Sequence, residues 1–192
     1  KGIGMVHQEF MLLPGFTIAE NIKLNREITR PSALSRIFGR NLERLDMPAM
    51  AADARKALDS VGMGIDEYTL VKGLPVGYMQ FVEIAREIDK TGIKLLVFDE
   101  PTAVLTESEA KQLVSVMKKI SERGIAIIFI THRLDEVMAA SDSITILRDG
   151  QVVSALKTRD TSIVELAELM IGRKNESMIS VERRTLDPNA KV

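Results

Sequence analysis

The sequence predicts an α/β fold in which a parallel sheet is flanked by helices. Apolar runs at 94–98, 125–130 and 144–147 alternate with helical patterns at 107–123 and 133–140. Alternation of strands and helices at this spacing is typical of βαβ units with helices on both faces of the sheet. The four consecutive apolar residues of the first run also predict a strand that is buried on both faces.

The first half of the chain is predicted to be mainly helical. The pattern predicts the end of a strand over residues 2–6 and a smaller helical subdomain over about 18–90. Within that subdomain, helical segments are expected at 18–24, 49–61 and 79–90. The polar and basic stretch 25–48, which contains Pro31, Gly39 and Pro48, is predicted to be irregular or partly helical.

The C-terminal part begins with a strong hairpin signal. Asp149-Gly150 separates two apolar runs, as in a tight two-residue turn. A last helix over 163–171 is expected to end at Gly172, which suits the position after a helix. Residues 173–192 are charged and aperiodic, so we expect a linker or a tail there.

Composition limits the classes of function. The net charge of −1 does not favour a nucleic-acid partner, and the absence of cysteine excludes disulfides and thiolate metal sites. The longest apolar run, 125–130, is far shorter than the ~20 residues that cross a bilayer, and no signal peptide is visible. If the protein serves a membrane, we expect it to act from the cytoplasmic side through a partner.

Two adjacent carboxylates, Asp99 and Glu100, follow the strand predicted at 94–98. Ligands of open α/β sheets bind at the carboxyl ends of strands, and two neighbouring acids repel each other unless a cation or a proton transfer employs them. Nucleotide hydrolysis uses both, because an aspartate holds Mg²⁺ and an adjacent acid activates water. The alternative is an acidic turn broken by Pro101.

Three further features accompany the acid pair in the same order along the chain. Gln8 follows the first strand, a glycine-containing loop precedes the helical pattern near Met79, and His132 follows the strand over 125–130. Considered alone, His132 would be interpreted as a structural histidine, and Gln8 would be interpreted as a solvated amide in a loop. The loop consists of Leu74, Pro75, Val76, Gly77 and Tyr78.

Together these motifs resemble the nucleotide-binding domain of ATP-binding-cassette (ABC) transporters over residues 2–172, a P-loop NTPase-like fold. The resemblance implies that Asp99 holds Mg²⁺, that Glu100 is the general base, and that His132 contacts the γ-phosphate of ATP. It also implies that Gln8 reaches the metal and couples the site to a membrane subunit. Residues 74–78 occupy the place of the signature loop, which binds the nucleotide held by an opposing domain.

Within this family, segments 10–14, 17–22 and 169–173 look like the importers of simple sugars and nucleosides. The resemblance implies part of the ATP-hydrolysing subunit of a bacterial importer, at the cytoplasmic face of the membrane. Its partners would be a permease, a second nucleotide-binding domain in tandem or as a dimer and, indirectly, a solute-binding protein.

The sequence departs from the family in two places. No Gly-x-x-x-x-Gly-Lys-[Ser/Thr] loop occurs in the 192 residues, so the chain looks N-terminally truncated and is expected to bind ATP weakly. The family's Leu-Ser-Gly-Gly-Gln signature appears as 74–78, with Pro75 in place of the serine hydroxyl. The resemblance therefore implies that the composite site using this signature hydrolyses ATP poorly.

The missing segment would also carry a strand that lies in the family between those at 125–130 and 144–147. We expect either that these two strands pair directly or that another copy of the chain fills the gap, giving a homo-oligomer through open sheet edges. Two other functions remain open. One is a truncated, non-catalytic interaction module, and the other is a soluble ABC-type ATPase of DNA repair or translation.

Overall fold

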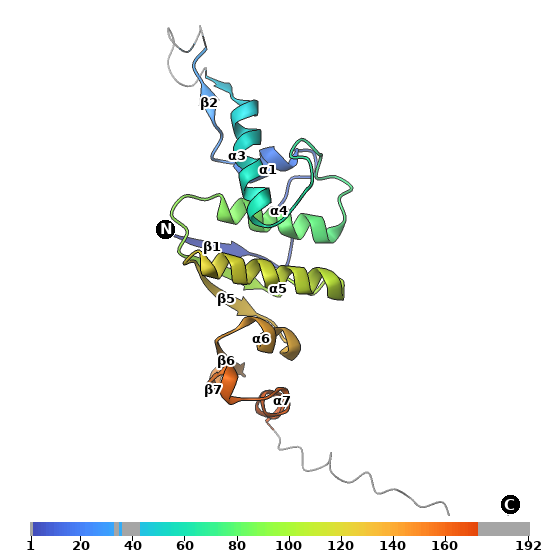
Figure 1. Cartoon of the computed structure of the whole chain (residues 1–192), viewed down its shortest axis with the longest axis vertical. Helices are drawn as coiled ribbons and strands as arrows, with labels where there is room; N and C mark the ends of the chain where they lie inside the picture. The colour runs from blue at the N-terminus through green and yellow to red at the C-terminus, as the bar shows by residue number, and fades with distance from the viewer. Residues whose placement is uncertain (1, 33–34, 36–42, 173–192) are drawn as a thin grey trace, which may run out of the picture. The chain divides into compact units, whose positions relative to one another are not determined.

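The protein is described by a computed structural model that places residues 2–32, 35 and 43–172 (Figure 1). Its contacts form two compact units, Lys1–Ala140 and a second unit that begins at Ser141. The stretch 173–192, predicted as a linker or tail, lies outside the described residues. None of the described helices has the length and apolar character that a membrane span requires.

The first unit contains a parallel three-stranded sheet. Its strands are β1 (Ile3–Val6), β4 (Leu95–Asp99) and β5 (Ala126–Ile130), in the order β1-β4-β5. The register pairs Val6 with Phe98 and Phe98 with Phe129, so the three strands end at the same edge. The predicted α/β class with a parallel sheet is confirmed.

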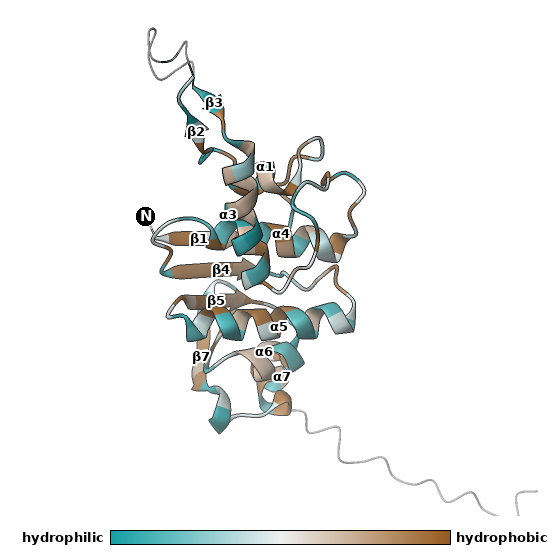
Figure 2. Ribbon diagram, turned by 45° about the horizontal axis from the view of Figure 1, so that its top comes forward, coloured by the Kyte–Doolittle hydropathy of each residue, from teal (hydrophilic) through white to brown (hydrophobic). Residues whose placement is uncertain are grey.

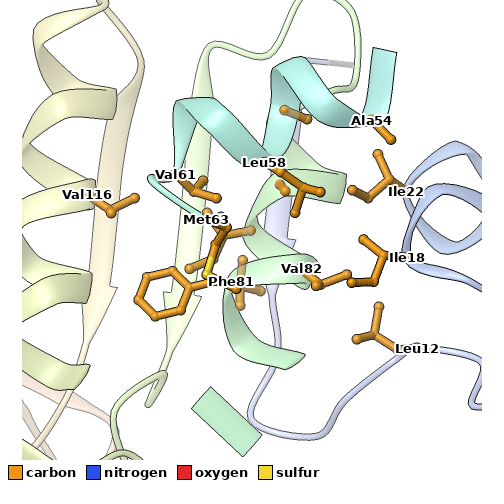
Figure 3. Packing of buried hydrophobic residues seen from close by; sticks show 14 of the residues in the cluster. Leu12, Ile18, Ile22, Ala54, Leu58, Val61, Met63, Phe81, Val82 and Val116 are labelled. Carbon is orange, nitrogen blue, oxygen red and sulfur yellow. The ribbon is translucent and has the colours of Figure 1, made fainter. Parts of the chain in front are cut away.

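Among the described residues five helices accompany this sheet, and four of them contribute to the hydrophobic core. Helices α1 (Ile18–Lys23), α3 (Met47–Ser60) and α4 (Val76–Ile88) pack on one another, and α4 also packs on β1. Helix α5 (Glu107–Glu122) contributes one apolar side to the same core, and α6 (Leu134–Ala140) packs on α5. Figure 3 shows side chains of this core, including Val82 from α4 and Val116 from α5.

Capping residues explain where two of these helices begin. The hydroxyls of Thr17 and Thr106 each accept a hydrogen bond from the backbone N–H three residues later, and the glutamate at that position accepts one from the N–H of the cap residue. This reciprocal capping box satisfies two backbone donors that the first helical turn leaves free. The cap of α5 is therefore Thr106.

The two faces of the sheet differ in burial. Leu96 and Phe98 are fully buried against the helices. On the other face, Ile3, Ile128 and Ile130 are 61%, 49% and 47% exposed. Figure 2 shows how apolar all three strands are. On this second face β4 itself has Leu95 and Val97, which are half-buried, so the prediction of a strand buried on both faces holds fully for one face and only in part for the other.

The outer edge of β5 is unpaired within the described residues. β5 hydrogen-bonds to β4, whereas β6 (Ser143–Arg148) pairs with β7 (Gln151–Lys157) in a separate antiparallel sheet. The expected direct pairing of the strands at 125–130 and 144–147 is therefore wrong. A tight turn gives β6 a partner next to it in sequence, at a small loop-closure cost.

The second unit consists of this hairpin and α7 (Ile163–Ile171), joined through a 3₁₀ turn (Thr158–Asp160). Asp149 and Gly150 both have positive φ, 52° and 77°, as a type I′ turn requires, so the predicted hairpin is confirmed. Helix α7 packs on β6 and ends at Gly172, whose φ is 76°. That helix end was also predicted correctly.

The stretch 25–48, predicted to be irregular or partly helical, contains a short antiparallel pair in its described part, whereas residues 33–34 and 36–42 lie outside the described residues. Its strands are β2 (Thr29–Arg30) and β3 (Arg44–Leu45). Next to it, the buried Lys23 of α1 forms ion pairs with Asp53 of α3 at 2.9 Å and with Asp89 at 3.0 Å. Burial alone would lower the pKa of Lys23, but hydrogen bonds to the two aspartates outweigh it and raise this pKa.

Candidate functional site

The site begins at the end of β4, where the chain turns sharply. Asp99 is the last residue of the strand, and Glu100 has a φ of 45°, in the left-handed region that residues with a side chain rarely adopt. The Glu100 N–H donates to the carbonyl of Ile130 at 2.9 Å, which ties this turn to the end of β5. The two strand ends therefore lie side by side.

Glu100 and His132 meet at this edge of the sheet. The Oε1 atom of Glu100 lies 3.2 Å from Nδ1 of His132, and the two side chains are 34% and 67% exposed. When His132 donates from Nδ1 to this carboxylate, its Nε2 atom remains available for another partner. The pair thus combines a proton acceptor with a second group able to donate or accept a proton.

A network of hydrogen-bonded side chains lies next to this edge of the sheet, and the sequence did not predict it. Thr102, which is 2% exposed, donates to Glu136 of α6 at 2.7 Å. The other oxygen of Glu136 lies 2.8 Å from Nη1 of Arg133, and the Arg133 N–H donates to the hydroxyl of Thr131. His132 is therefore held between two anchored neighbours.

Asp99 is half-buried, and its side chain makes no hydrogen bond or ion pair within the part of the chain that the structure describes. An unpaired carboxylate beside a second acid suits a cation. The described residues contain no group of three or more metal-ligating side chains. A hard cation such as Mg²⁺ at Asp99 would complete its shell with waters and phosphate oxygens, as Mg²⁺ usually does.

Gln8 lies just beyond the end of β1 and is exposed. Val6 pairs with Phe98 in the sheet. Gln8 lies two residues after Val6, just as Glu100 lies two residues after Phe98. The structure thus brings Gln8 to the same sheet edge as the acid pair. Its amide makes no hydrogen bond to the described residues.

The loop predicted to replace the signature runs directly into α4. Pro75 is the N-cap and gives no side-chain hydrogen bond, and the helix begins at Val76, three residues earlier than the sequence indicated. Leu74 is half-buried, whereas Val76 and Tyr78 are 38% and 43% exposed. No hydrogen bond or ion pair of the described residues joins this loop to Asp99, Glu100 or His132.

Gly77 allows a close contact between this helix and α5. A Cβ atom at Gly77 would overlap the Glu109 carboxylate, which therefore lies against the first turn of α4. Hydrogen bonds from the Thr106 N–H and hydroxyl lower the pKa of Glu109, so it is an anion at neutral pH. This contact borders a cavity of about 700 Å³ that Tyr78 and Gln112 also line.

Three relatives with similar sequences are import proteins. A ribose import ATP-binding protein of Chelativorans sp. is 36% identical over 191 residues, and a glucose import ATP-binding protein of Haloferax volcanii is 39% identical over 210. A nucleoside import ATP-binding protein of Lactococcus lactis subsp. cremoris is 40% identical over 172 residues. These matches cover 100%, 100% and 90% of this chain but only 35%, 37% and 32% of the relatives, about a third of their length.

Solved structures share the fold. A nucleotide-free ATP-binding cassette of an ABC transporter aligns with a TM-score of 0.64 at 25% identity, over 81% of this chain and 61% of that one. A dimeric ATP-binding cassette bound to ADP and Pi gives 0.64 at 23% identity, over 83% and 64%. The ABC transporter family model matches residues 1–103, more than half of the chain. The protein therefore belongs to the ABC transporter family and carries part of its ATPase domain.

Proposed function

We propose that this chain is part of the ATP-hydrolysing subunit of a bacterial importer for a simple sugar or a nucleoside. Residues 1–172 would form a partial nucleotide-binding domain, with the helical subdomain over about 18–90, and 173–192 a linker. The observation that carries the proposal is the 3.2 Å contact between Glu100 and His132 beside the unpaired Asp99. The names of the ribose, glucose and nucleoside import relatives support the kind of solute.

In this proposal, Mg²⁺-ATP supplies the γ-phosphate that water attacks. It also supplies the positive charge of the metal ion, which the two carboxylates face. Asp99 would hold the metal, with the Gln8 amide oxygen as a second ligand. Glu100 would take the proton of the attacking water, and His132 would orient that carboxylate through Nδ1. The network of Thr102 and Glu136 keeps the turn in place, so that these groups are ordered before a substrate arrives.

This chain by itself is proposed not to hydrolyse ATP. The loop that supplies phosphate-binding N–H groups and a lysine is absent from the 192 residues. We expect isothermal calorimetry with Mg²⁺-ATP to show affinity no better than about millimolar, or roughly 4 kcal/mol of binding free energy. Asp99→Asn is the matched control, and it should leave this weak heat unchanged. A micromolar Kd that Asp99→Asn abolishes would contradict the prediction.

The signature loop is proposed to make one of two composite sites weak. Pro75 offers neither a hydroxyl nor a backbone N–H to a phosphate, and the Glu109 anion already lies against the first turn of α4. In a longer form of the protein with an opposing domain, Pro75→Ser should raise ATP turnover at this composite site by about tenfold, since a hydrogen bond to a charged group is worth ~1.5–3 kcal/mol. Total turnover, to which the other site also contributes, should then rise by no more than about twofold. Phosphate release measures this, with Pro75→Ala as the control. Equal rates for both variants would count against the role of the hydroxyl.

The partners proposed for the intact protein are a membrane permease and a second nucleotide-binding domain, with a solute-binding protein reached through the permease. The chain would then lie at the cytoplasmic face of the membrane. Exposed apolar side chains form a patch on the first unit, which we call the docking patch, and we assign it to an apolar helix face of the permease. It consists of Met11, Leu13, Phe16, Tyr68 and Leu70.

Backbone hydrogen bonds join the two segments of the docking patch. Val71 N–H donates to the Phe16 carbonyl at 3.0 Å, and Ile18 N–H donates to Thr69 at 2.9 Å. The two segments that carry the patch therefore lie next to each other, which supports its use as one binding surface. The unpaired edge of β5 is proposed as a second contact, through which copies of the isolated chain associate.

A further inference from the structure

The segment after Gln8 is held by side chains in place of a neighbouring strand. Residues 11–13 alternate in burial: Met11 and Leu13 are 58% and 41% exposed, and Leu12 between them is 8% exposed. Such alternation is typical of an extended strand with one face on a core. Its backbone groups, however, bond to side chains of two helices, α4 and α1.

Two residues of α4 bind both backbone groups of Met11. The Met11 N–H donates to Oε1 of Glu83, and Nη1 of Arg86 donates to the Met11 carbonyl at 2.8 Å. Glu83 and Arg86 are three residues apart on one helix face and lie 3.5 Å from each other as an ion pair. Together they satisfy the N–H and the carbonyl of Met11, as a neighbouring strand would in a sheet.

One residue of α1 does the same for Leu13. The Leu13 N–H donates to Oδ1 of Asn21 at 2.7 Å, and Nδ2 of Asn21 donates back to the Leu13 carbonyl at 3.1 Å. Asn21 is fully buried. The backbone of the segment is thereby held at two residues, Met11 by α4 and Leu13 by α1.

The burial of Glu83 strengthens its hydrogen bond to the Met11 N–H. Glu83 is 1% exposed, and a buried carboxylate is costly unless donors compensate it. Burial raises the pKa of Glu83, while the Met11 N–H and the Arg86 charge act in the opposite direction. Release of the segment would leave that carboxylate without its backbone donor, so the segment and the helix are held together.

We propose that Glu83 and Arg86, assisted by Asn21, are positioning residues that fix segment 11–13 on α4. The segment carries Met11 and Leu13 of the docking patch and lies three residues after Gln8, while α4 begins at the loop 74–78. A partner that moves the patch would therefore move Gln8 and α4 together. The role of this joint movement in transport rests on the proposed function, whereas the hydrogen bonds that hold segment 11–13 do not.

The test is the rate of amide hydrogen exchange in this chain without nucleotide. Glu83→Ala should speed exchange of the Met11 N–H by roughly 10- to 100-fold, as loss of a hydrogen bond to a charged group predicts. Glu83→Gln keeps an oxygen acceptor and should restore most of the protection. Glu107→Gln is the control, because this glutamate of α5 is ion-paired to Lys111 and does not bind segment 11–13.

Exchange at Phe98 in β4 reports global unfolding. If Glu83→Ala speeds exchange at Phe98 as well, Arg86→Met decides, because it removes the donor to the Met11 carbonyl and keeps an apolar stem. The proposal is supported if exchange at Met11 accelerates more than exchange at Phe98, each relative to the unaltered chain, in Arg86→Met and, where Glu83→Ala remains folded, in that variant too. Unchanged Met11 exchange in Arg86→Met, or exchange in Glu83→Gln as fast as in Glu83→Ala, overturns it. Since ATP is absent, these outcomes are independent of the calorimetric test of the proposed function.

Discussion

Glu100→Gln is expected to reduce ATP turnover by roughly 100- to 10,000-fold in a longer form of the protein that includes a phosphate loop. Glutamine keeps the shape of the side chain and its contact with His132 but does not take a proton from water. Asp99 is unchanged, so nucleotide affinity should stay within a few-fold. Phosphate release at saturating Mg²⁺-ATP measures the effect, with binding measured separately.

Glu107→Gln provides the control for this experiment. Glu107 is an exposed acid at the start of α5, ion-paired to Lys111 at 2.7 Å, and its loss should leave turnover unchanged. A second check is a double-mutant cycle with His132→Ala. Because Glu100 and His132 are in contact, the loss in the double variant should be well below the product of the single losses. Independent effects, or a Glu100→Gln variant with near-normal turnover, would refute the role given to the pair.

The sequence predicted most of the fold because apolar periodicity is a local signal. The strands at 94–98 and 125–130, the hairpin at Asp149-Gly150 and the end of α7 at Gly172 all depend on neighbouring residues. Where prediction failed, the signal was short or not local. The pair β2–β3 has two residues in each strand, too few for periodicity to show.

Part of the candidate site was equally accessible to sequence reasoning. Asp99, Glu100 and His132 follow apolar strands, and parallel strands place their carboxyl ends at one edge, which is where Glu100 and His132 meet. The supporting contacts were not accessible. Thr102 and Glu136 are 34 residues apart, and Met11 and Glu83 are 72 apart, so no spacing rule joins them.

The start of α4 shows how a tertiary contact changes a local expectation. Helical periodicity indicated a start near Met79, because Pro75 and Gly77 are poor helix formers. The helix starts at Val76, with Pro75 as its cap, and the absence of a Cβ at Gly77 admits Glu109 from α5. Proline suits the N-terminal end of a helix, and an anion there favours the first turn.

Phe98→Ala is expected to lower the free energy of unfolding by about 3–5 kcal/mol, the usual cost of removing a buried aromatic side chain. Phe98 is fully buried and lies in the centre of the β1-β4-β5 sheet, on the face that α4 and α5 cover. A loss of this size is a large fraction of the stability of a small domain. Urea denaturation followed by circular dichroism measures it.

Ile128→Lys is the matched substitution on the opposite face, one strand away. Ile128 is 49% exposed, so the lysine should change the unfolding free energy by no more than about 0.5 kcal/mol, as is usual for surface positions. It also places a charge next to the unpaired edge of β5, a change that opposes strand pairing between copies. Sedimentation velocity should therefore show less self-association for Ile128→Lys than for the unaltered chain. Comparable destabilisation by the two substitutions would mean that both faces are buried, and unchanged self-association would remove β5 as the contact between copies.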